Sequence, residues 1–454
     1  MKITAYGGAG KIGGNKFLLE AGGARIFLDF GEPFDRGEPF YTGMEFMKPR
    51  KNLGLKDYFE FDMIPQIEGL YDAKHLVNTN LPYKPPAFDA VIISHIHCDH
   101  MGDIEWMDAG IPVYMGHGAK ALNDIYNVCY PYQFRRKDNG NVREFKTGDV
   151  IRIKELEIMP VHVDHSTPAA YGFVIKTPEG TITYTGDYRM HGFRPEMTRD
   201  LIKAGAGSDI LMTEGTRMRP QEDDDPFREA ITENDVMEKM AQMMKEEKGL
   251  ILADFSVKNI DRLRSMYEAC RASGRVMMIN PRTAYIMKHA AALFTPTLPD
   301  PLKDPLVKIF RKNADNESAR ELSWEKEFLA SAVGYEWVAQ NQGSAAMLVT
   351  DTELQQLIDI KPKEGSFIYS MSEHYIEGED NEEKRIALNA WLGHFNIKFK
   401  QAHCSGHADR EAIKEMVNGI APGRVIPMHT EHPEEFKKLH KDVVVLETGK
   451  LLEL

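Results

Sequence analysis

Ala90-Val-Ile-Ile-Ser-His-Ile-His-Cys-Asp-His100 is the stretch that decides the fold of this chain. Its apolar first four residues predict a short buried strand, and an HxHxDH motif follows directly. Because alternate side chains of an extended backbone point the same way, His95 and His97 can reach one metal ion. Asp99 and His100 follow where the chain turns, and they can reach a second ion. Imidazole and carboxylate ligands suit zinc, with manganese or iron as alternatives.

Three more apolar runs end in a histidine or an aspartate, and strand ends are where sheet scaffolds present functional groups. The runs are residues 158–161 before His162 and His165, 181–184 before Asp187, and 424–428 before His429. We expect these strand ends to meet the HxHxDH motif in the folded chain.

Not every residue at these strand ends has the same role. His162 and His165 compete for one position, and we favour His165 because Ser166-Thr-Pro168 turns the chain directly after it. Asp187 follows a glycine in a tight turn, where a carboxylate can bridge two cations. Asp29 ends an apolar run, and its apolar neighbours predict that it is buried and needs partners, which favours orienting a metal ligand over binding metal itself.

The segment before the motif, residues 2–31, reads as short strands separated by glycine turns. Gly8-Ala-Gly-Lys-Ile-Gly13 within it matches the GxGxxG dinucleotide fingerprint. That fingerprint requires a helix after it, and further strand pattern follows here, so we exclude dinucleotide binding. Lys11 precedes Ile12 rather than serine or threonine, which excludes a Walker-type phosphate loop.

The pattern changes at about residue 216, where helices and apolar strands begin to alternate. Helical spacing is found at residues 235–248, 259–273 and 382–394, and buried parallel strands are predicted at 250–253 and 275–279. Strand-ending histidines resume only after these segments. One α/β domain therefore interrupts another.

Composition excludes several classes of protein. No apolar run approaches the roughly 20 residues that span a bilayer, and no signal segment opens the chain, so we expect a cytoplasmic protein. The four cysteines lie far apart without a CxxC pair, which excludes a disulfide scaffold and a thiolate zinc knuckle. A net charge of −13 excludes a histone-like coat on nucleic acid, although a local positive cleft is compatible with it.

Together these motifs resemble a known superfamily. HxHxDH, a lone histidine and Thr185-Gly-Asp187, on two strand-rich halves, resemble the metallo-β-lactamase fold. His403-Cys-Ser-Gly-His-Ala408 and Val425-Ile-Pro-Met-His-Thr-Glu431 resemble the closing motifs of the β-CASP nucleases, and most of all those of the ribonuclease J family. The resemblance implies an α/β protein, an αββα metallo-β-lactamase sandwich at residues 1–215 and 398–454 with an inserted β-CASP domain at 216–397.

The resemblance also implies roles for individual residues. Two zinc ions, or manganese, would be held by seven ligands: His95, His97 and His165 at the first ion, Asp99, His100 and His429 at the second, and Asp187 between them. Glu214 and His407 would form a catalytic pair beside the ions. The strand-end pattern, read without the family, predicts the same seven ligands. Glu214 and His407 come only from the family motifs.

The implied reaction is hydrolysis of RNA phosphodiester bonds, mainly from the 5′ end, with possible endonuclease activity. Walls of a 5′-phosphate pocket are expected at four residues: Ser370, Ser372, His403 and Ser405. This sequence departs from the family there, because Tyr369-Ser-Met-Ser372 stands near the place of a glycine-serine-glutamine-glycine stretch. Phosphate contacts are expected either from Arg135–Lys137 or from Arg217 and Arg219, with solvated surface charge as the alternative for each. Single-stranded RNA with a 5′-monophosphate and a second copy of the chain are the expected partners, with no membrane.

Four other functions share parts of the pattern. A DNA nuclease of the same superfamily shares every motif quoted above. A small-molecule hydrolase such as a lactonase shares the metal ligands but needs neither the inserted domain nor His407. A non-catalytic subunit of this fold is disfavoured because no predicted ligand is missing, and an oxygen-reducing di-iron protein would have a glutamate at His97.

The sequence also stops about 25 residues after His429, as in shorter archaeal-type members of the family.

Overall fold

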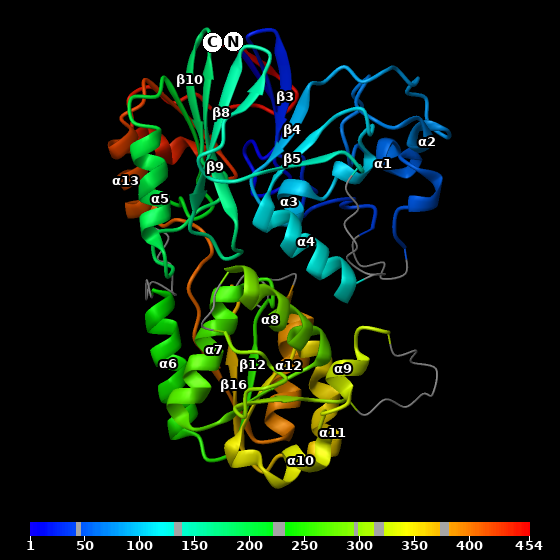
Figure 1. Ribbon diagram of the computed structural model, residues 1–454, viewed down its shortest axis with the longest axis vertical. Coiled ribbons are helices and arrows are strands. Elements are labelled where there is room, and N and C mark those ends of the chain that lie inside the picture. Colours follow the sequence, from blue (N-terminus) through cyan, green and yellow to red (C-terminus); the bar gives the residue numbers. More distant parts are fainter. Residues whose placement is uncertain (42–46, 131–138, 221–231, 295–297, 313–321, 373–380) are drawn as a thin grey trace.

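Two sheets facing one another form the first body of the protein, seen at the top of Figure 1. The computed structural model describes residues 1–41, 47–130, 139–220, 232–294, 298–312, 322–372 and 381–454. The first sheet has seven strands in the order β19-β1-β2-β3-β4-β5-β6. Their bounds are β1 (Lys2–Gly7), β2 (Lys16–Ala21), β3 (Ala24–Leu28), β4 (Ala90–Ile93), β5 (Val113–Gly116), β6 (Val142–Phe145) and β19 (Leu451–Glu453). Because β19 pairs with β1, the two ends of the chain lie side by side (Figure 1).

The second sheet has six strands in the order β18-β11-β10-β9-β8-β7. These are β7 (Ile151–Ile153), β8 (Leu156–Val163), β9 (Ala170–Thr177), β10 (Gly180–Tyr184), β11 (Ile210–Glu214) and β18 (Arg424–Met428). Strand β18 joins its neighbour β11 in parallel, with Glu214 opposite Met428. That register places His429, the next residue, directly beside the end of β11.

Alternation along the strands divides the apolar side chains between two cores. Ile26 and Leu28 of β3 pack between the two sheets against residues such as Phe173 and Met212, whereas Phe27 faces the helices outside. The outer faces are covered by α1 (Lys56–Glu60), α2 (Ala73–Leu76), α3 (Cys98–Met101) and α4 (His117–Cys129) on the first sheet, and by α5 (Pro195–Ala204) and α13 (Arg410–Ile420) on the second. The expected αββα sandwich is confirmed.

A third sheet, of six parallel strands, builds the lower body in Figure 1. Its order is β14-β13-β15-β12-β16-β17, with bounds β12 (Leu250–Asp254), β13 (Val276–Ile279), β14 (Val307–Ile309), β15 (Ala345–Leu348), β16 (Gly365–Tyr369) and β17 (Ile397–Gln401). The central strands β12 and β16 are buried at every position, because helices cover both faces of the sheet. The helices are α6 (Glu233–Glu246), α7 (Ile260–Ser273), α8 (Pro281–Phe294), α9 (Lys326–Leu329), α10 (Tyr335–Gln340), α11 (Leu357–Ile360) and α12 (Glu382–His394).

The element boundaries follow local chemistry. Helix α6 begins at Glu233, two residues before the predicted start, because Thr232 and Asp235 form a reciprocal capping box. The Gly8–Gly13 loop leads into strand β2, as expected, rather than into a helix. None of the helices within the described residues is both long enough and apolar enough to cross a membrane.

Candidate metal centre

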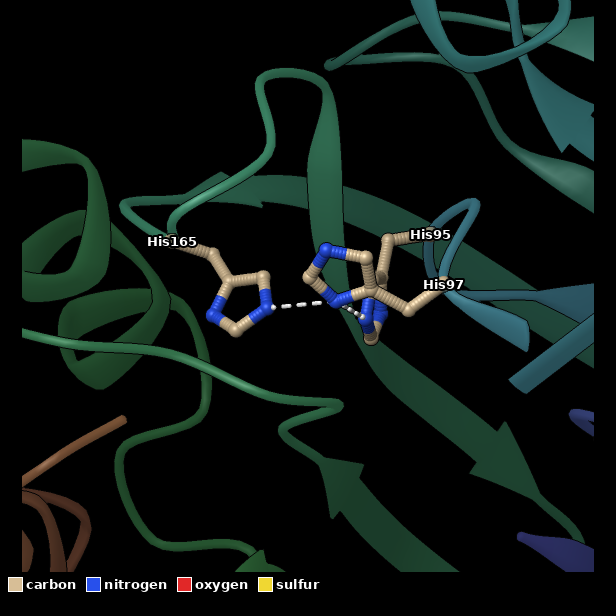
Figure 2. Close-up of side chains that lie close together, drawn as sticks. All are labelled: His95, His97 and His165. Atoms are coloured by element: carbon tan, nitrogen blue, oxygen red, sulfur yellow. Dashed lines mark hydrogen bonds between the residues drawn. The ribbon is translucent and has the colours of Figure 1, made fainter. Parts of the chain in front are cut away.

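Three histidine side chains converge at the ends of β4 and β8 (Figure 2). His95 and His97 follow β4, and His165 follows β8. The Nδ1 atom of His97 lies 3.0 Å from His95 Nε2 and 3.1 Å from His165 Nε2. His162 lies elsewhere, stacked on the ring of Tyr171. Of the two competing histidines, the structure therefore brings His165 to the cluster.

Two of these imidazoles are oriented by bonds at their other nitrogen. His95 Nδ1 lies 3.0 Å from Ser94 Oγ, and His165 Nδ1 donates to the carbonyl oxygen of Gly406 at 2.7 Å. Glycine at residue 406 permits this approach, because a Cβ there would lie 2.7 Å from the Ser166 hydroxyl and would force Ser166 to move. These bonds leave Nε2 of His95 and His165 directed at His97, with lone pairs available to a cation.

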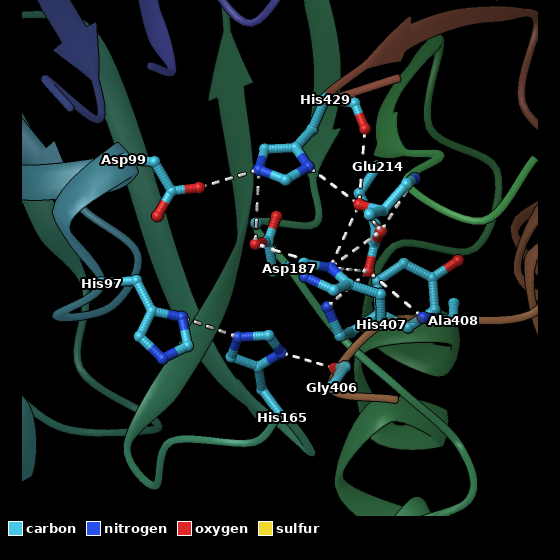
Figure 3. A network of polar contacts seen from close by, with 12 residues as sticks. His97, Asp99, His165, Asp187, Glu214, Gly406, His407, Ala408 and His429 are labelled. Atoms are coloured by element: carbon cyan, nitrogen blue, oxygen red, sulfur yellow. Dashed lines mark hydrogen bonds and ion pairs between the residues drawn. The ribbon is translucent and has the colours of Figure 1, made fainter. Parts of the chain in front are cut away.

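A second cluster lies beside the first and joins four buried residues, of which Figure 3 labels Asp99, Asp187 and His429. His429 Nε2 lies 2.9 Å from Asp99 Oδ2, and His100 Nε2 lies 3.0 Å from Asp187 Oδ2. The same Asp187 oxygen is 3.9 Å from His95 Nε2 in the first cluster. Asp187 therefore stands between the two groups, where the sequence predicted a bridging ligand.

The donor atoms of this cluster are suited to a cation. His100 Nε2 and both carboxylate oxygens of Asp187 are buried, and apart from the 3.0 Å ion-pair approach between them they have no hydrogen bond of normal geometry among the described residues. Leaving such atoms without a partner costs free energy, and metal coordination removes that cost. The nitrogen and oxygen donors found here are those that zinc and manganese accept. The side chains present therefore fit the metal that the sequence implies.

The absence of a proton on these imidazoles also favours metal binding at the first cluster. Burial, together with the neighbouring histidines, lowers the pKa of His95 and of His165 well below the ordinary value. Burial lowers the pKa of His97 to about 3. All three imidazoles are thus neutral at physiological pH, and the neutral ring is the form that ligates a metal.

Asp29 takes the orienting position that the sequence predicted for it. Its carboxylate accepts from Ser94 N at 2.7 Å, from the Tyr184 hydroxyl at 2.6 Å and from His100 Nδ1 at 2.8 Å. The bond to Nδ1 directs His100 Nε2 at Asp187. Asp29 and His429 both have left-handed backbone, with φ of 58° and 52°, a strained conformation that occurs preferentially at functional sites.

Glu214 and His407 form a pair beside the second cluster (Figure 3). The buried Glu214 carboxylate lies 3.2 Å from His407 Nδ1 and also accepts from the backbone N–H groups of Tyr188 and Ala408. Burial opposes the charged imidazole, but the Glu214 and Asp187 carboxylates outweigh it and raise the pKa of His407 to about 9. His407 Nδ1 is 3.7 Å from the nearer Asp187 oxygen.

The four residues predicted to bind the RNA 5′ end differ in whether their polar groups are already hydrogen-bonded. The Ser370 hydroxyl is buried and donates to the Ala402 carbonyl, while it accepts from Arg262. His403 Nδ1 donates to the Ser370 carbonyl at 3.1 Å, and burial followed by the charge of Arg262 lowers the pKa of His403 to about 3. These bonds occupy groups that were expected to face a phosphate.

Ser405 and Ser372 lie in the same region. Ser405 Oγ accepts from the His407 backbone N–H at 3.1 Å, and the Ser372 carbonyl accepts from the Tyr369 hydroxyl. Among the predicted phosphate contacts, Arg219 is exposed and Arg217 is half-buried. Residues 135–137 lie outside the described part of the chain.

Three residues of this region were missed by the sequence reasoning. Thr216 Oγ1 lies 2.7 Å from Glu214 Oε2, 3.1 Å from His407 Nδ1 and 2.8 Å from His429 Nδ1, so it joins the pair to the metal cluster. Arg262 and Glu233 form a buried ion pair behind the site. Thr216 follows Glu214 by two residues and could have been noticed, whereas nothing local marks Arg262 or Glu233.

Two segments of the chain match known families. Residues 62–252 match the beta-lactamase superfamily domain, and residues 394–443 match the Zn-dependent metallo-hydrolase RNA specificity domain. The first match contains six of the seven predicted ligands, and the second contains His429 and His407. Both clusters of donor atoms thus lie within segments that resemble metal-dependent hydrolases.

Curated relatives are similar over the whole chain. Ribonuclease J of Pyrococcus abyssi is 24% identical, covering 100% of this chain and 97% of its own length. Ribonuclease J of Methanocaldococcus jannaschii is 22% identical, with 100% and 98% covered. Ribonuclease J of Helicobacter pylori strain 26695 is 23% identical, and the match covers 95% of this chain but 56% of that protein.

A solved structure supports the fold. A protein of unknown function from Enterococcus faecalis V583 superposes with a TM-score of 0.77 at 23% identity, covering 100% of this chain and 99% of that one. At this identity the likeness concerns the fold alone. It extends over both bodies of the molecule.

Proposed function

Because the chain is a ribonuclease J-like protein of the metallo-β-lactamase/β-CASP family, and so a metal-dependent hydrolase, we propose that it hydrolyses the phosphodiester bonds of RNA. The observation that carries the proposal is the Glu214–His407 pair, which with His429 forms a third group of candidate donor atoms beside two clusters of side chains that could hold metal ions. A hydrolase of small molecules needs the metal clusters but has no use for a second acid–base pair at this position.

Seven residues would hold two zinc ions, with manganese as the alternative. His95, His97 and His165 would bind the first ion, Asp99, His100 and His429 the second, and Asp187 both. Bound there, the two ions would neutralise the scissile phosphate and lower the pKa of water to near neutrality. A single Asp187 oxygen within 3.9 Å of donors in both clusters supports the bridging role.

His407 supplies the proton in this proposal. A general acid must carry a proton and lie within reach of the leaving oxygen. The Glu214 carboxylate stabilises the charged imidazole, and 23% of the His407 side chain remains exposed to solvent. Protonation of the 3′ oxygen by His407 would then complete cleavage. Glu214 would hold the ring in place, because its own oxygens also accept from fixed backbone N–H groups.

We further propose that RNA binds where the two bodies meet. The domains would comprise residues 1–215 and 398–454 for the metallo-β-lactamase part, and 216–397 for the β-CASP part. A 5′ end held near Ser372, His403 and Ser405 would lead to release of single nucleotides in the 5′-to-3′ direction. Ser370 and His403 would contribute through their places in the chain, since the Ser370 hydroxyl and His403 Nδ1 are occupied. A homodimer remains our expectation for the assembly.

One set of substrates tests the proposal. RNA and DNA of the same sequence, labelled at the 5′ end and carrying either a monophosphate or a triphosphate, should be incubated with the zinc-loaded protein. We expect labelled mononucleotides from 5′-monophosphorylated RNA, slower cleavage of the triphosphate and no cleavage by Asp187→Ala.

Other outcomes would contradict specific parts. Equal cleavage of DNA would make the protein a general or DNA nuclease. Internal fragments that form regardless of the 5′ group would show that the protein is an endonuclease rather than an exonuclease. Two bound metal ions without cleavage of any nucleic acid would overturn the proposed function.

A further inference from the structure

Residues 402–407, here called the crossing segment, run from strand β17 of the lower body to helix α13 of the upper body. Its backbone accepts two hydrogen bonds from histidines of the upper body. The Gly406 carbonyl accepts from His165 Nδ1 at 2.7 Å, and the Ser405 carbonyl accepts from His191 Nε2 at 2.7 Å. The segment also carries His407. Its position therefore sets both the orientation of His165 and the location of the proposed acid.

The guanidinium of Arg262 holds this segment from inside the lower body. Arg262 is fully buried on α7 and donates to the Cys404 carbonyl at 3.2 Å and to the Ser370 carbonyl at 2.7 Å. The Ser370 hydroxyl, which also accepts from Arg262, in turn donates to the Ala402 carbonyl. One side chain thus fixes the crossing segment directly at residue 404 and indirectly at residue 402.

Glu233 connects Arg262 to a second buried arginine. Its carboxylate accepts from Arg262 Nε at 2.7 Å and Nη2 at 3.1 Å, and it lies 3.4 Å from Arg189 Nη1. Arg189 also pairs with Asp164 at 3.2 Å and with Asp261 at 2.7 Å. All five side chains are buried in the structure.

The arginine network reaches the metal ligands through the chain itself. Asp164 directly precedes His165, and Arg189 lies two residues after Asp187. The Arg189 backbone N–H also donates to the Asp164 carbonyl at 2.7 Å. Loops that carry two of the proposed ligands are thereby joined to α6 and α7 of the lower body.

Stability alone is a poor reason for such a network. Removing charges from water costs so much that a buried ion pair is often no more stable than apolar residues of the same volume. What the network does provide is direction, since a guanidinium donates along fixed lines to several acceptors at once. Here those acceptors belong to the crossing segment and to the elements that the segment must contact.

We propose that Arg262 is a positioning residue for the metal centre: through Glu233, Ser370 and Cys404 it fixes the crossing segment, and so the Gly406 carbonyl and His407. The inference rests on the proposed function for the role of His407, but its effect on His165 concerns metal binding alone. Lysine cannot replace Arg262 in this role, because an ammonium group is a point charge and lacks the planar fork of donors of a guanidinium.

Arg275 provides a matched control. It is also buried in the lower body, and it donates to the carbonyls of Met244 at 2.9 Å, Gly249 at 3.0 Å and Ala345 at 3.1 Å. None of these acceptors lies in the crossing segment. Arg275→Lys should therefore lower the stability of the fold without moving the metal centre.

Two quantities should be measured for purified Arg262→Lys and Arg275→Lys. One is zinc affinity, by competition with a chelator, and the other is the steady-state rate of RNA cleavage. We expect Arg262→Lys to lower zinc affinity or kcat by roughly 10- to 100-fold with KM unchanged, the range typical of residues that orient metal ligands. Arg275→Lys should keep both values at the wild-type level. If Arg262→Lys does not fold, Glu233→Gln, which keeps the side-chain size, replaces it with the same expected result.

Equal zinc affinity and equal kcat in Arg262→Lys and the wild type would overturn the inference and leave Arg262 a structural residue. Equal losses in Arg262→Lys and Arg275→Lys would overturn it as well, since both would then reflect general destabilisation. Should the wild type cleave no RNA, the proposed function fails, and zinc affinity still decides whether Arg262 positions the centre.

Discussion

The position of His407 illustrates how single residues shape this site. Its Nδ1 faces the Glu214 carboxylate at 3.2 Å and the Thr216 hydroxyl at 3.1 Å, while its ring lies 5.3 Å from that of His165 and 5.4 Å from that of His429. The imidazole therefore contacts both the acidic residue that stabilises its charge and the rings of two proposed ligands. Such a location suits a group that gives a proton to a departing oxygen.

Replacement of His407 by alanine tests this role. We expect kcat for RNA cleavage to fall by roughly 100- to 10,000-fold, the usual cost of losing a general acid, with both metal ions retained. Glu214→Gln should cause a smaller loss, because the amide still occupies the space but no longer stabilises the imidazolium. Single-turnover cleavage and elemental analysis measure the two effects. Loss of a metal ion with normal turnover after resupply would instead make His407 a ligand.

At the scale of elements, short connections after parallel strands carry the site. Strands β8, β10, β11 and β18 run in the same direction, so their carboxyl ends meet at one edge of the second sheet. Helix α13 begins three residues after His407. Its first turn is capped by Asp409, whose carboxylate accepts from the Ala412 N–H at 2.8 Å. Five buried side chains of α13 then pack on the second sheet: Ala412, Ile413, Met416, Val417 and Ile420.

Asp409→Ala should therefore lower the free energy of unfolding by about 1 kcal/mol, the typical cost of losing a side-chain cap. Asp409→Asn keeps an oxygen acceptor at the same position and should lose much less. Urea denaturation followed by circular dichroism measures both variants. Equal stability of the alanine variant and the wild type would show that the packing of α13, rather than its cap, holds the helix start.

At the scale of the molecule, the seven proposed ligands come from four segments that are distant in sequence, from His95 to His429. An unfolded chain does not hold these segments together, so metal binds the folded state in strong preference. The proposed ions would also add positive charge locally to a chain whose net charge is −13. Bound metal would thus contribute to stability and to attraction of a polyanion at the same place.

Removal of metal should consequently destabilise the whole protein. At free zinc about 1,000 times the dissociation constant, binding to the folded state alone adds about 4 kcal/mol of stability. We expect a higher Tm for the zinc-loaded protein than for the chelated protein, and no such difference in Asp187→Ala. His162→Ala, which removes a histidine outside both clusters, should keep the wild-type response. A Tm that is the same with and without zinc would contradict the proposed site.

Local pattern was enough to predict which side chains the fold brings together as candidate metal ligands, and the kind of fold. His95, His97, Asp99 and His100 are recognisable because a metal site needs several donors at short spacing after a strand. Apolar runs such as residues 90–93 and 250–253 predict buried strands, because burial on one or both faces leaves its period in the sequence. The strands and helices that these patterns predicted are present, with ends displaced by one or two residues where caps decide them.

Tertiary structure alone decided the contacts between distant segments. It brought Glu214 to His407, 193 residues later, and showed that the Ser370 hydroxyl is occupied rather than open to a phosphate. It also revealed Arg262, whose partners lie on other elements and leave no local pattern. The sequence by itself therefore determined which side chains are suited to hold metal, because that depends on residue type and spacing. Only the fold determined how those side chains are oriented, because orientation depends on neighbours that packing supplies.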